Sequence, residues 1–178
     1  YQYCWENISV PYLRSVKDPF CNTDNKQILK QVLNDYDLET HDFLEWTEEL
    51  TQEEIHNRIT AHLKTDLGAI LDMEPVEKGP GGHISKLRIV GKDKEFIVGK
   101  ELEIRRMLCT STLKSSAFTI EVKDIEDGIP GRFVLHGRGW GHGVGLCQIG
   151  AAVMGEQGYG YKQILKHYYT DIQIKRLS

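Results

Sequence analysis

Residues 135–149 read LHGRGWGHGVGLCQI, with glycine at every second position over 137–145. Arg138, Trp140 and His142 lie between these glycines. In an extended backbone successive side chains point to opposite faces, so one face would be bare and the other would carry a guanidinium, an indole and an imidazole. Glycine loses more conformational freedom on folding than any other residue. The pattern therefore predicts that a flat or bulky group approaches this backbone closely, or that the chain adopts dihedral angles that favour glycine.

Length, charge and hydropathy exclude several classes of protein. The chain has 178 residues, which is enough for a single domain with a substantial core. Its net charge of −4 argues against nucleic acid as a partner. No apolar run approaches the roughly 20 residues that a membrane span needs. The chain opens at Tyr1 without an initiator methionine or a signal peptide, and we expect it to be a trimmed part of a longer protein.

The four cysteines leave two interpretations open. They are Cys4, Cys21, Cys109 and Cys147, and no CxxC pair occurs among them, which weakens a zinc-ribbon interpretation. Cys4 and Cys21 are close enough in sequence to form a disulfide in an oxidising compartment. The alternative is four separate, partly buried thiols.

Hydrophobic periodicity predicts an α+β fold: a single domain with a mainly antiparallel sheet and interspersed helices. Thr51 and Glu54 form a capping-box pattern at the start of one helix. In the last helix we expect Tyr161 and Tyr168 to face inward. The expected helices are 26–36, 51–64, 100–108, 148–156 and 161–169. The expected strands are 41–46, 70–73, 83–90, 95–98, 116–122, 131–136 and 172–174, with a short extended piece at 10–20.

Several kinds of site use glycine-rich loops, and the spacing separates some of them. The dinucleotide and phosphate-loop fingerprints both require registers that this stretch lacks. A phosphate at the following helix N-terminus and a metal held by His136, His142 and Cys147 remain open. So does a packed loop with Trp140 in the core. The functional competitor is a carbohydrate groove, in which an indole faces a sugar ring and Arg138 and His142 donate hydrogen bonds.

Resemblance to a known family favours the groove. Residues 137–174, GRGWGHGVGLCQIGAAVMGEQGYGYKQILKHYYTDIQI, resemble the C-terminal signature of the stage II sporulation protein D family (SpoIID/LytB). PYLRSVKDP at 11–19 and LKSSAF at 113–118 are similar to further blocks of that family, so the resemblance covers almost the whole chain. Three positions depart from it: Cys147 stands where serine is usual, His83 stands where arginine is common, and Ala117 stands in place of an aromatic residue.

The resemblance implies a protein that binds cell-wall glycan outside the cytoplasm, in the periplasm or the cell wall. Members of the family are peptidoglycan lytic transglycosylases that act on glycan strands stripped of stem peptides, and others are enhancers of a cell-wall amidase. The family's acid/base glutamate lies in an N-terminal segment that has no counterpart here. We therefore expect residues 1–178 to form one SpoIID/LytB-like domain, the C-terminal portion of such a protein, and to be inactive alone.

The expected site binds substrate and is not catalytic by itself. We expect Arg138, His142 and Gln148 to make polar contacts with glycan, Trp140 to offer its ring, and Ser115 to supply a nearby hydroxyl. No metal or cofactor is expected. Glu121 and Glu156, the carboxylates nearest the motif in sequence, are interpreted as solvated surface groups. The expected partners are glycan strands and either the missing N-terminal segment or a cell-wall amidase, and the alternatives are a non-catalytic amidase enhancer or an interaction module without a glycan role.

Overall fold

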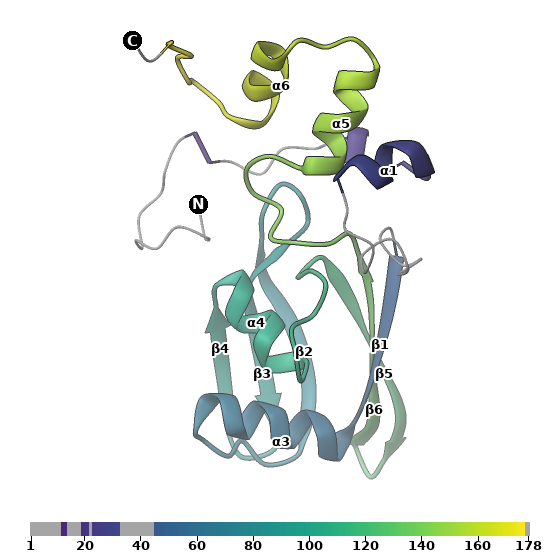
Figure 1. The fold of residues 1–178 in the computed structure, drawn as a ribbon. Helices are drawn as coiled ribbons and strands as arrows, with labels where there is room; N and C mark the ends of the chain where they lie inside the picture. Colours follow the sequence, from purple (N-terminus) through teal and green to yellow (C-terminus); the bar gives the residue numbers. More distant parts are fainter. Residues whose placement is uncertain (1–11, 14–18, 22, 33–44, 177–178) are drawn as a thin grey trace. The chain divides into compact units, whose positions relative to one another are not determined.

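A computed structural model describes residues 12–13, 19–21, 23–32 and 45–176 of the chain (Figure 1). The contacts between residues divide the chain into two compact units. Unit 1 consists of residues 1–42 and 143–178, and unit 2 consists of residues 43–142. The boundary at 142–143 lies inside the glycine-rich stretch, so the arginine, tryptophan and histidine of the motif belong to unit 2 and the glutamine to unit 1.

Unit 2 contains two three-stranded antiparallel sheets and two helices. The first sheet has the order β1-β6-β5, with β1 at Glu45–Thr51, β5 at Phe118–Glu126 and β6 at Ile129–Arg138. The second has the order β2-β3-β4, with β2 at Ile70–Lys78, β3 at Ile84–Gly91 and β4 at Glu95–Gly99. The helices are α3 (Gln52–Leu63) and α4 (Glu101–Leu108). In Figure 1, α3 runs across the ends of both sheets.

A single hydrophobic core joins these elements. The inner faces of the two sheets and of both helices contribute to it, through Leu50, Phe133, Ile89, Ile55 and Ile104 among others. These five side chains are completely buried. Because one face of each strand alternates into the core and the other faces solvent, the ends of β6 and β5 present polar side chains at the surface.

Helix α3 forms where its local signals predict it. The hydroxyl oxygen of Thr51 accepts a hydrogen bond from the backbone N–H of Glu54, and the Glu54 carboxylate accepts one from the backbone N–H of Thr51. The helix ends at Lys64, which adopts a left-handed conformation. Its apolar stripe buries Ile55 and Ile59 in the core, as the spacing predicts.

Unit 1 contains helices only, within its described residues. They are the short 3₁₀ helix η1 (Pro19–Cys21) and the α-helices α1 (Lys26–Val32), α5 (Gln148–Glu156) and α6 (Tyr161–Tyr168). The side-chain oxygen of Asn25 accepts from the backbone N–H of Gln27 and so caps α1. A disulfide joins Cys21 in η1 to Cys147 at the start of α5.

The α+β class with mainly antiparallel strands and interspersed helices is confirmed. Three expectations are wrong. Residues 172–174 form no strand, because a short apolar alternation needs a neighbouring strand to pair with and none pairs there in the described part of the chain. Tyr161 is 65% exposed and not turned inward, whereas Tyr168 is buried. Cys21 bonds to Cys147 and not to Cys4, which lies outside the described residues.

Other expectations are met in part. The first helix ends at Val32 in the described residues, and the remainder of the expected range lies outside them. The strand expected at 41–46 has its first four residues outside the described part, and β1 continues to Thr51. Within 10–20 the described residues include Pro19 and Phe20, which belong to a 3₁₀ helix, and most of that range is outside the description. Among the described helices, none combines the length and the apolar character that crossing a membrane requires.

Candidate functional site

At the first glycine of the stretch, Gly137, the ring of Trp46 lies against the backbone. A Cβ atom at Gly137 would lie 2.0 Å from Cζ2 of Trp46, which is far inside van der Waals contact. The indole N–H of Trp46 donates a hydrogen bond to the carbonyl of Gly139 at 3.2 Å. Gly137 pairs with Trp46 across β1 and β6, and it is glycine because the ring lies directly on its backbone. The predicted flat group is therefore a side chain of the protein itself at this position.

The remaining glycines of the stretch adopt dihedral angles that favour glycine. Strand β6 ends at Arg138, and Gly139, Gly141, Gly143 and Gly145 all have positive φ angles, between 68° and 100°. The stretch after β6 is therefore a winding loop. Because it is not an extended strand, the arginine, tryptophan and histidine do not form one row on a single face.

Ser115 and its neighbour Lys114 hold the start of this loop in place by hydrogen bonds. Its hydroxyl donates to the carbonyl of Arg138 at 2.7 Å and accepts from the backbone N–H of Ala117 at 3.2 Å. The backbone N–H of Gly141 donates to the carbonyl of Lys114 at 2.7 Å. The Ser115 side chain is completely buried, so both hydrogen bonds serve to fix the end of β6 and the first turn of the loop.

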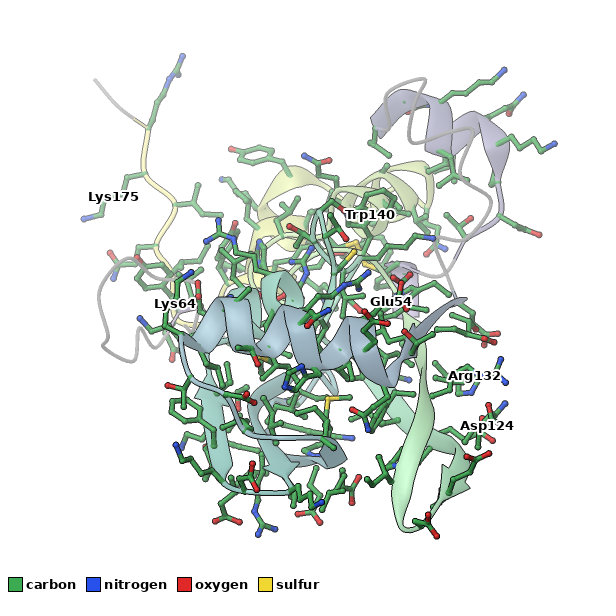
Figure 2. All side chains as sticks on the ribbon, turned by 90° about the horizontal axis from the view of Figure 1, so that it is seen from below. Glu54, Lys64, Asp124, Arg132, Trp140 and Lys175 are labelled. Atoms are coloured by element: carbon green, nitrogen blue, oxygen red, sulfur yellow. A yellow bond between two sulfur atoms is a disulfide. The ribbon has the colours of Figure 1, made fainter. Side chains whose placement is uncertain are left out.

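Two tryptophans of unit 2 have opposite surroundings. Trp46 is buried in the core, where its ring lies near that of Phe118 with the centroids 6.2 Å apart. Trp140, labelled in Figure 2, is 47% exposed. The interpretation of Trp140 as a core residue is therefore wrong: it lies in the loop after β6, between two glycines with positive φ angles, and not on the face of a strand that packs on the core.

Arg138 has an unusual environment for an arginine of unit 2. A Cβ atom at Gly82 would lie 2.8 Å from a guanidinium nitrogen of Arg138, so the side chain crosses from the end of β6 to the turn between β2 and β3. Arg138 makes no ion pair with any residue in the described part of the chain. The other five arginines of unit 2 each pair with a carboxylate: Arg58 with Glu48, Arg88 with Glu74, Arg105 with Glu101, Arg106 with Glu103, and Arg132 with Asp124.

Both histidines near this loop are held neutral. Burial, together with the proximity of His142 and Arg105, lowers the pKa of His83 to about 4. Burial and then the charge of Arg105 also lower the pKa of His142 below 6.5. A neutral imidazole has one donor and one acceptor nitrogen. At pH 7 His142 can therefore exchange hydrogen bonds with a sugar, but it carries no positive charge with which to bind an anion.

Arg105 is held in place by a buried ion pair. Its guanidinium donates to the Glu101 carboxylate at 2.9 Å and to the carbonyl of Leu113 at 2.6 Å. Burial raises the pKa of Glu101, and the charge of Arg105 opposes that rise. The pair fixes a positive charge beneath the two histidines, which is one reason that they stay unprotonated.

An open hollow of about 530 Å³ lies beside the end of β6, and we call it the β6 hollow. It combines aromatic rings, hydroxyls, two cationic side chains, a histidine and one carboxylate. The lining is Glu45, Trp46, Thr47, Lys78, Gly82, Ala117, Phe118, Thr119, His136, Gly137 and Arg138. Sequence reasoning found Arg138 but missed Lys78 and Glu45. The pairing of β1 with β6 sets Glu45 opposite Arg138, and this register is the signal that could have found it.

Gln148 and Cys147 belong to unit 1. Gln148 is exposed and is the first residue of α5. Cys147 caps that helix, since its sulfur accepts from the backbone N–H of Gly150, and the same sulfur is bonded to Cys21.

The metal site that the sequence left open, at His136, His142 and Cys147, is not formed. His136 lies 3.1 Å from the Glu121 carboxylate. No group of three or more histidine, cysteine, aspartate or glutamate side chains among the described residues could hold a metal ion, and the disulfide removes Cys147 as a thiolate ligand.

Neither carboxylate near the motif is arranged as a proton donor. Hydrogen bonds from His136 and Lys123 lower the pKa of Glu121, so this side chain is ionised at neutral pH. Glu156 is exposed at the C-terminal end of α5. The prediction that both are surface carboxylates is confirmed by their exposure.

These features define an α+β protein in which the central strand of one sheet leads into a glycine-rich loop with an exposed tryptophan, and in which the arginine at the end of that strand has no ion-pair partner among the described residues. The chain belongs to the family described as a domain of unknown function, DUF8618, whose model matches residues 1–145. It is 30% identical over 172 residues to an uncharacterized protein of Brachyspira hyodysenteriae, covering 94% of this chain and 37% of that protein.

Two further relatives match over shorter stretches. The chain is 37% identical over 67 residues to the amidase enhancer of Bacillus subtilis, covering 38% of the chain and 9% of that protein. It is 46% identical over 44 residues to stage II sporulation protein D of Bacillus amyloliquefaciens, covering 25% of the chain and 13% of that protein. The chain is thus related to SpoIID-like proteins over part of its length, and it spans well under half of each relative.

Proposed function

We propose that this chain is the peptidoglycan-binding part of a lytic transglycosylase that cleaves glycan strands stripped of their stem peptides. The observation that carries the proposal is the glycine-rich loop: Trp140 presents an exposed indole, and Arg138, which has no ion-pair partner among the described residues, lines the β6 hollow. The names of the two Bacillus relatives support a role at the cell wall. The proposal puts the chain outside the cytoplasm, in the cell envelope.

The roles of the side chains follow from their surroundings. Trp140 offers its exposed ring to the apolar face of a sugar. Arg138 and the neutral imidazole of His142 hydrogen-bond to sugar hydroxyl and amide groups. Ser115 acts indirectly, because its buried hydroxyl fixes the backbone of Arg138.

Bond cleavage requires a further group. Protonating the leaving oxygen of a glycosidic bond needs a positioned carboxyl group, and such general acid catalysis contributes about 10²–10⁴-fold. A transglycosylase then forms an anhydro ring by attack of the sugar's own hydroxyl, so one acid/base residue suffices. The ionised Glu121 is unsuited to that role, and we propose that the catalytic carboxyl comes from a segment outside residues 1–178.

Substitution of Trp140 tests the binding proposal. We expect Trp140→Ala to weaken retention on purified, peptide-free wall glycan about three- to tenfold, since stacking on an aromatic ring contributes on the order of 1 kcal/mol. The melting temperature should stay within a degree or two, because the ring is largely exposed. Phe96→Ala is the matched control, since Phe96 is similarly exposed, at 44%, but lies on β4 of the other sheet, outside the glycine-rich loop. Equal retention of both variants and the wild type would contradict the proposal.

An amidase enhancer is the alternative, favoured by the match to the B. subtilis protein of that name. In this function the chain binds wall or amidase and cleaves nothing. Digestion of stripped glycan by the full-length parent protein, read by mass spectrometry for anhydro-sugar ends, separates the two. Anhydro ends support the transglycosylase, whereas glycan binding without anhydro ends, combined with a faster amidase, supports the enhancer.

A further inference from the structure

We propose that the β6 hollow is a subsite for the free carboxylate of an acidic sugar, which Arg138 and Lys78 bind together. This inference rests on the proposed function for the identity of the polymer. It assigns the cationic side chains of the hollow a role in choosing between glycan strands that carry a free carboxylate and strands in which that carboxylate is capped.

The two cations reach the hollow from different elements. Lys78 is the last residue of β2, and Arg138 is the last residue of β6. Both line the hollow, and so does Gly82. The guanidinium of Arg138 lies over the turn at Gly82, where a Cβ atom would come 2.8 Å from its nearest nitrogen.

Charge at the hollow is not balanced by the protein. In the described part of the chain neither Lys78 nor Arg138 forms an ion pair, although close neighbours do. Lys86, in the partner strand of the same hairpin, pairs with Glu77 at 2.8 Å. Arg132, in the same strand as Arg138, pairs with Asp124 at 2.6 Å, and both are labelled in Figure 2.

One carboxylate faces these two cations. Glu45 lines the hollow and is the cross-strand partner of Arg138, yet no oxygen of Glu45 comes within 4.0 Å of either cationic group. Cross-strand partners ordinarily lie close enough to interact. The arginine instead extends toward Gly82. The hollow therefore keeps two cations against one carboxylate, and a single added carboxylate would balance it.

The remaining lining suits a saccharide that carries this anion. A guanidinium presents parallel N–H donors that match both oxygens of a carboxylate. Thr47 and Thr119, which are exposed, supply hydroxyls that can hydrogen-bond to the sugar. In a stripped glycan strand each muramic ring bears a free lactyl carboxylate, whereas in a peptide-bearing strand that group is a neutral amide. A subsite for the carboxylate therefore distinguishes stripped from peptide-bearing strands.

The test on polymer compares three strands: stripped glycan, the same glycan with its lactyl carboxylates converted to methyl esters, and peptide-bearing glycan. The wild-type chain should bind the free acid at least about tenfold more tightly than the ester. Arg138→Gln and Lys78→Gln should each reduce that ratio several-fold while still retaining the ester. Lys92→Gln, which removes the same charge from an exposed turn outside the hollow, should leave the ratio unchanged. Equal binding of acid and ester by the wild type would overturn the inference.

A test without polymer separates this inference from the proposed function. Titration with lactate, followed by NMR at the amides of Gly82 and Gly137, should give saturable shifts in the wild type and none in Arg138→Gln. Lactamide, which is neutral, should give no shifts. Loss of all glycan binding together with specific lactate shifts would contradict the proposed function and keep the subsite. Glycan binding together with identical responses to lactate and lactamide would overturn the carboxylate subsite and leave the proposed function standing.

Discussion

At the scale of single residues, the glycines of the motif do two different jobs. Gly137 makes room for the ring of Trp46, whereas Gly139 and Gly141 allow the turn that follows β6. Only the first job depends on packing, because a Cβ atom at Gly139 or Gly141 would meet no atom within 4 Å. Substitution therefore has different physical consequences at positions that look alike in the sequence.

Gly137→Ala should destabilise unit 2 by about 1–3 kcal/mol, because the new methyl group would overlap the indole of Trp46 and force the ring or the strand to move. Thermal or urea unfolding of the variant measures this loss. Gly99→Ala is the control, since that strand position is open, and its effect should be within about 0.5 kcal/mol. Similar unfolding midpoints for the two variants would contradict the close approach.

The glycine pattern predicted how the backbone behaves in this stretch, but it did not predict which group lies against it. Alternating glycines predicted a close approach or left-handed angles, and both are found. The identity of the approaching group could not be predicted, since Trp46 is 91 positions away in the sequence and reaches Gly137 only through the pairing of β1 with β6.

At the scale of elements, Cys147 links the start of α5 to η1. Its sulfur accepts the hydrogen bond that caps the helix, and its disulfide with Cys21 closes a loop across 126 positions. In the family that the motif resembles, serine is usual at this position. A serine would keep an acceptor for the cap and lose the cross-link, so the two contributions can be measured separately.

Cys147→Ser should speed amide hydrogen exchange in α5 by a factor that corresponds to about 2–5 kcal/mol, the usual loss when a native disulfide is removed. Cys147→Ala should cost about 1 kcal/mol more, because it also removes the cap. Adding a dithiol reductant to the wild type should reproduce the serine variant. Exchange in α5 that is indifferent to reductant would show that the cross-link does not hold this helix.

Elements with local signals were predicted well. The capping box of Thr51 and Glu54 and the apolar spacing give α3 its bounds, and α5 matches its expected range of 148–156. The strand predicted at 172–174 is absent because its local pattern is not enough: a strand forms only when another strand pairs with it. The disulfide partner of Cys21 was predicted wrongly as well, because closeness in the sequence does not show which loops the fold brings together.

At the scale of the whole molecule, the arginines of unit 2 are distributed so that all but Arg138, at the start of the glycine-rich loop, pair with a carboxylate among the described residues. Five arginines have carboxylate partners, while Arg138 has none among the described residues. Two histidines near the same region are kept neutral by burial and by the positive charges around them.

This arrangement predicts a pH dependence of unfolding. The pKa of His83 is about 4 in the folded chain against 6.5 when unfolded, so the unfolded state takes up its proton first as the pH falls. Stability should be complete above about pH 6.5 and should decline toward pH 4, by at most about 3 kcal/mol from this group. His142, whose pKa is also lowered, acts in the same direction.

His83→Gln isolates that contribution. The variant should lose less stability than the wild type between pH 6.5 and 4.5, measured by urea unfolding across the range. Carboxylates with lowered pKa values, such as Glu77 and Glu121, titrate below this window in the folded chain and lose their contributions at lower pH. Parallel pH profiles for variant and wild type would show that His83 is not held neutral.

The sequence by itself determined the α+β class, the local bounds of α3 and α5, and that the glycine-rich stretch needs either a close approach to its backbone or dihedral angles that favour glycine. Each of these depends on residues within a few positions of one another, through caps, spacing and the conformational freedom of glycine. Only the tertiary structure decided that Trp46 covers Gly137, that Arg138 lies on Gly82, and that Lys78 and Glu45 share the β6 hollow. The physical reason is that strand register and core packing bring these groups together across long stretches of chain, and no local pattern encodes which distant residue arrives.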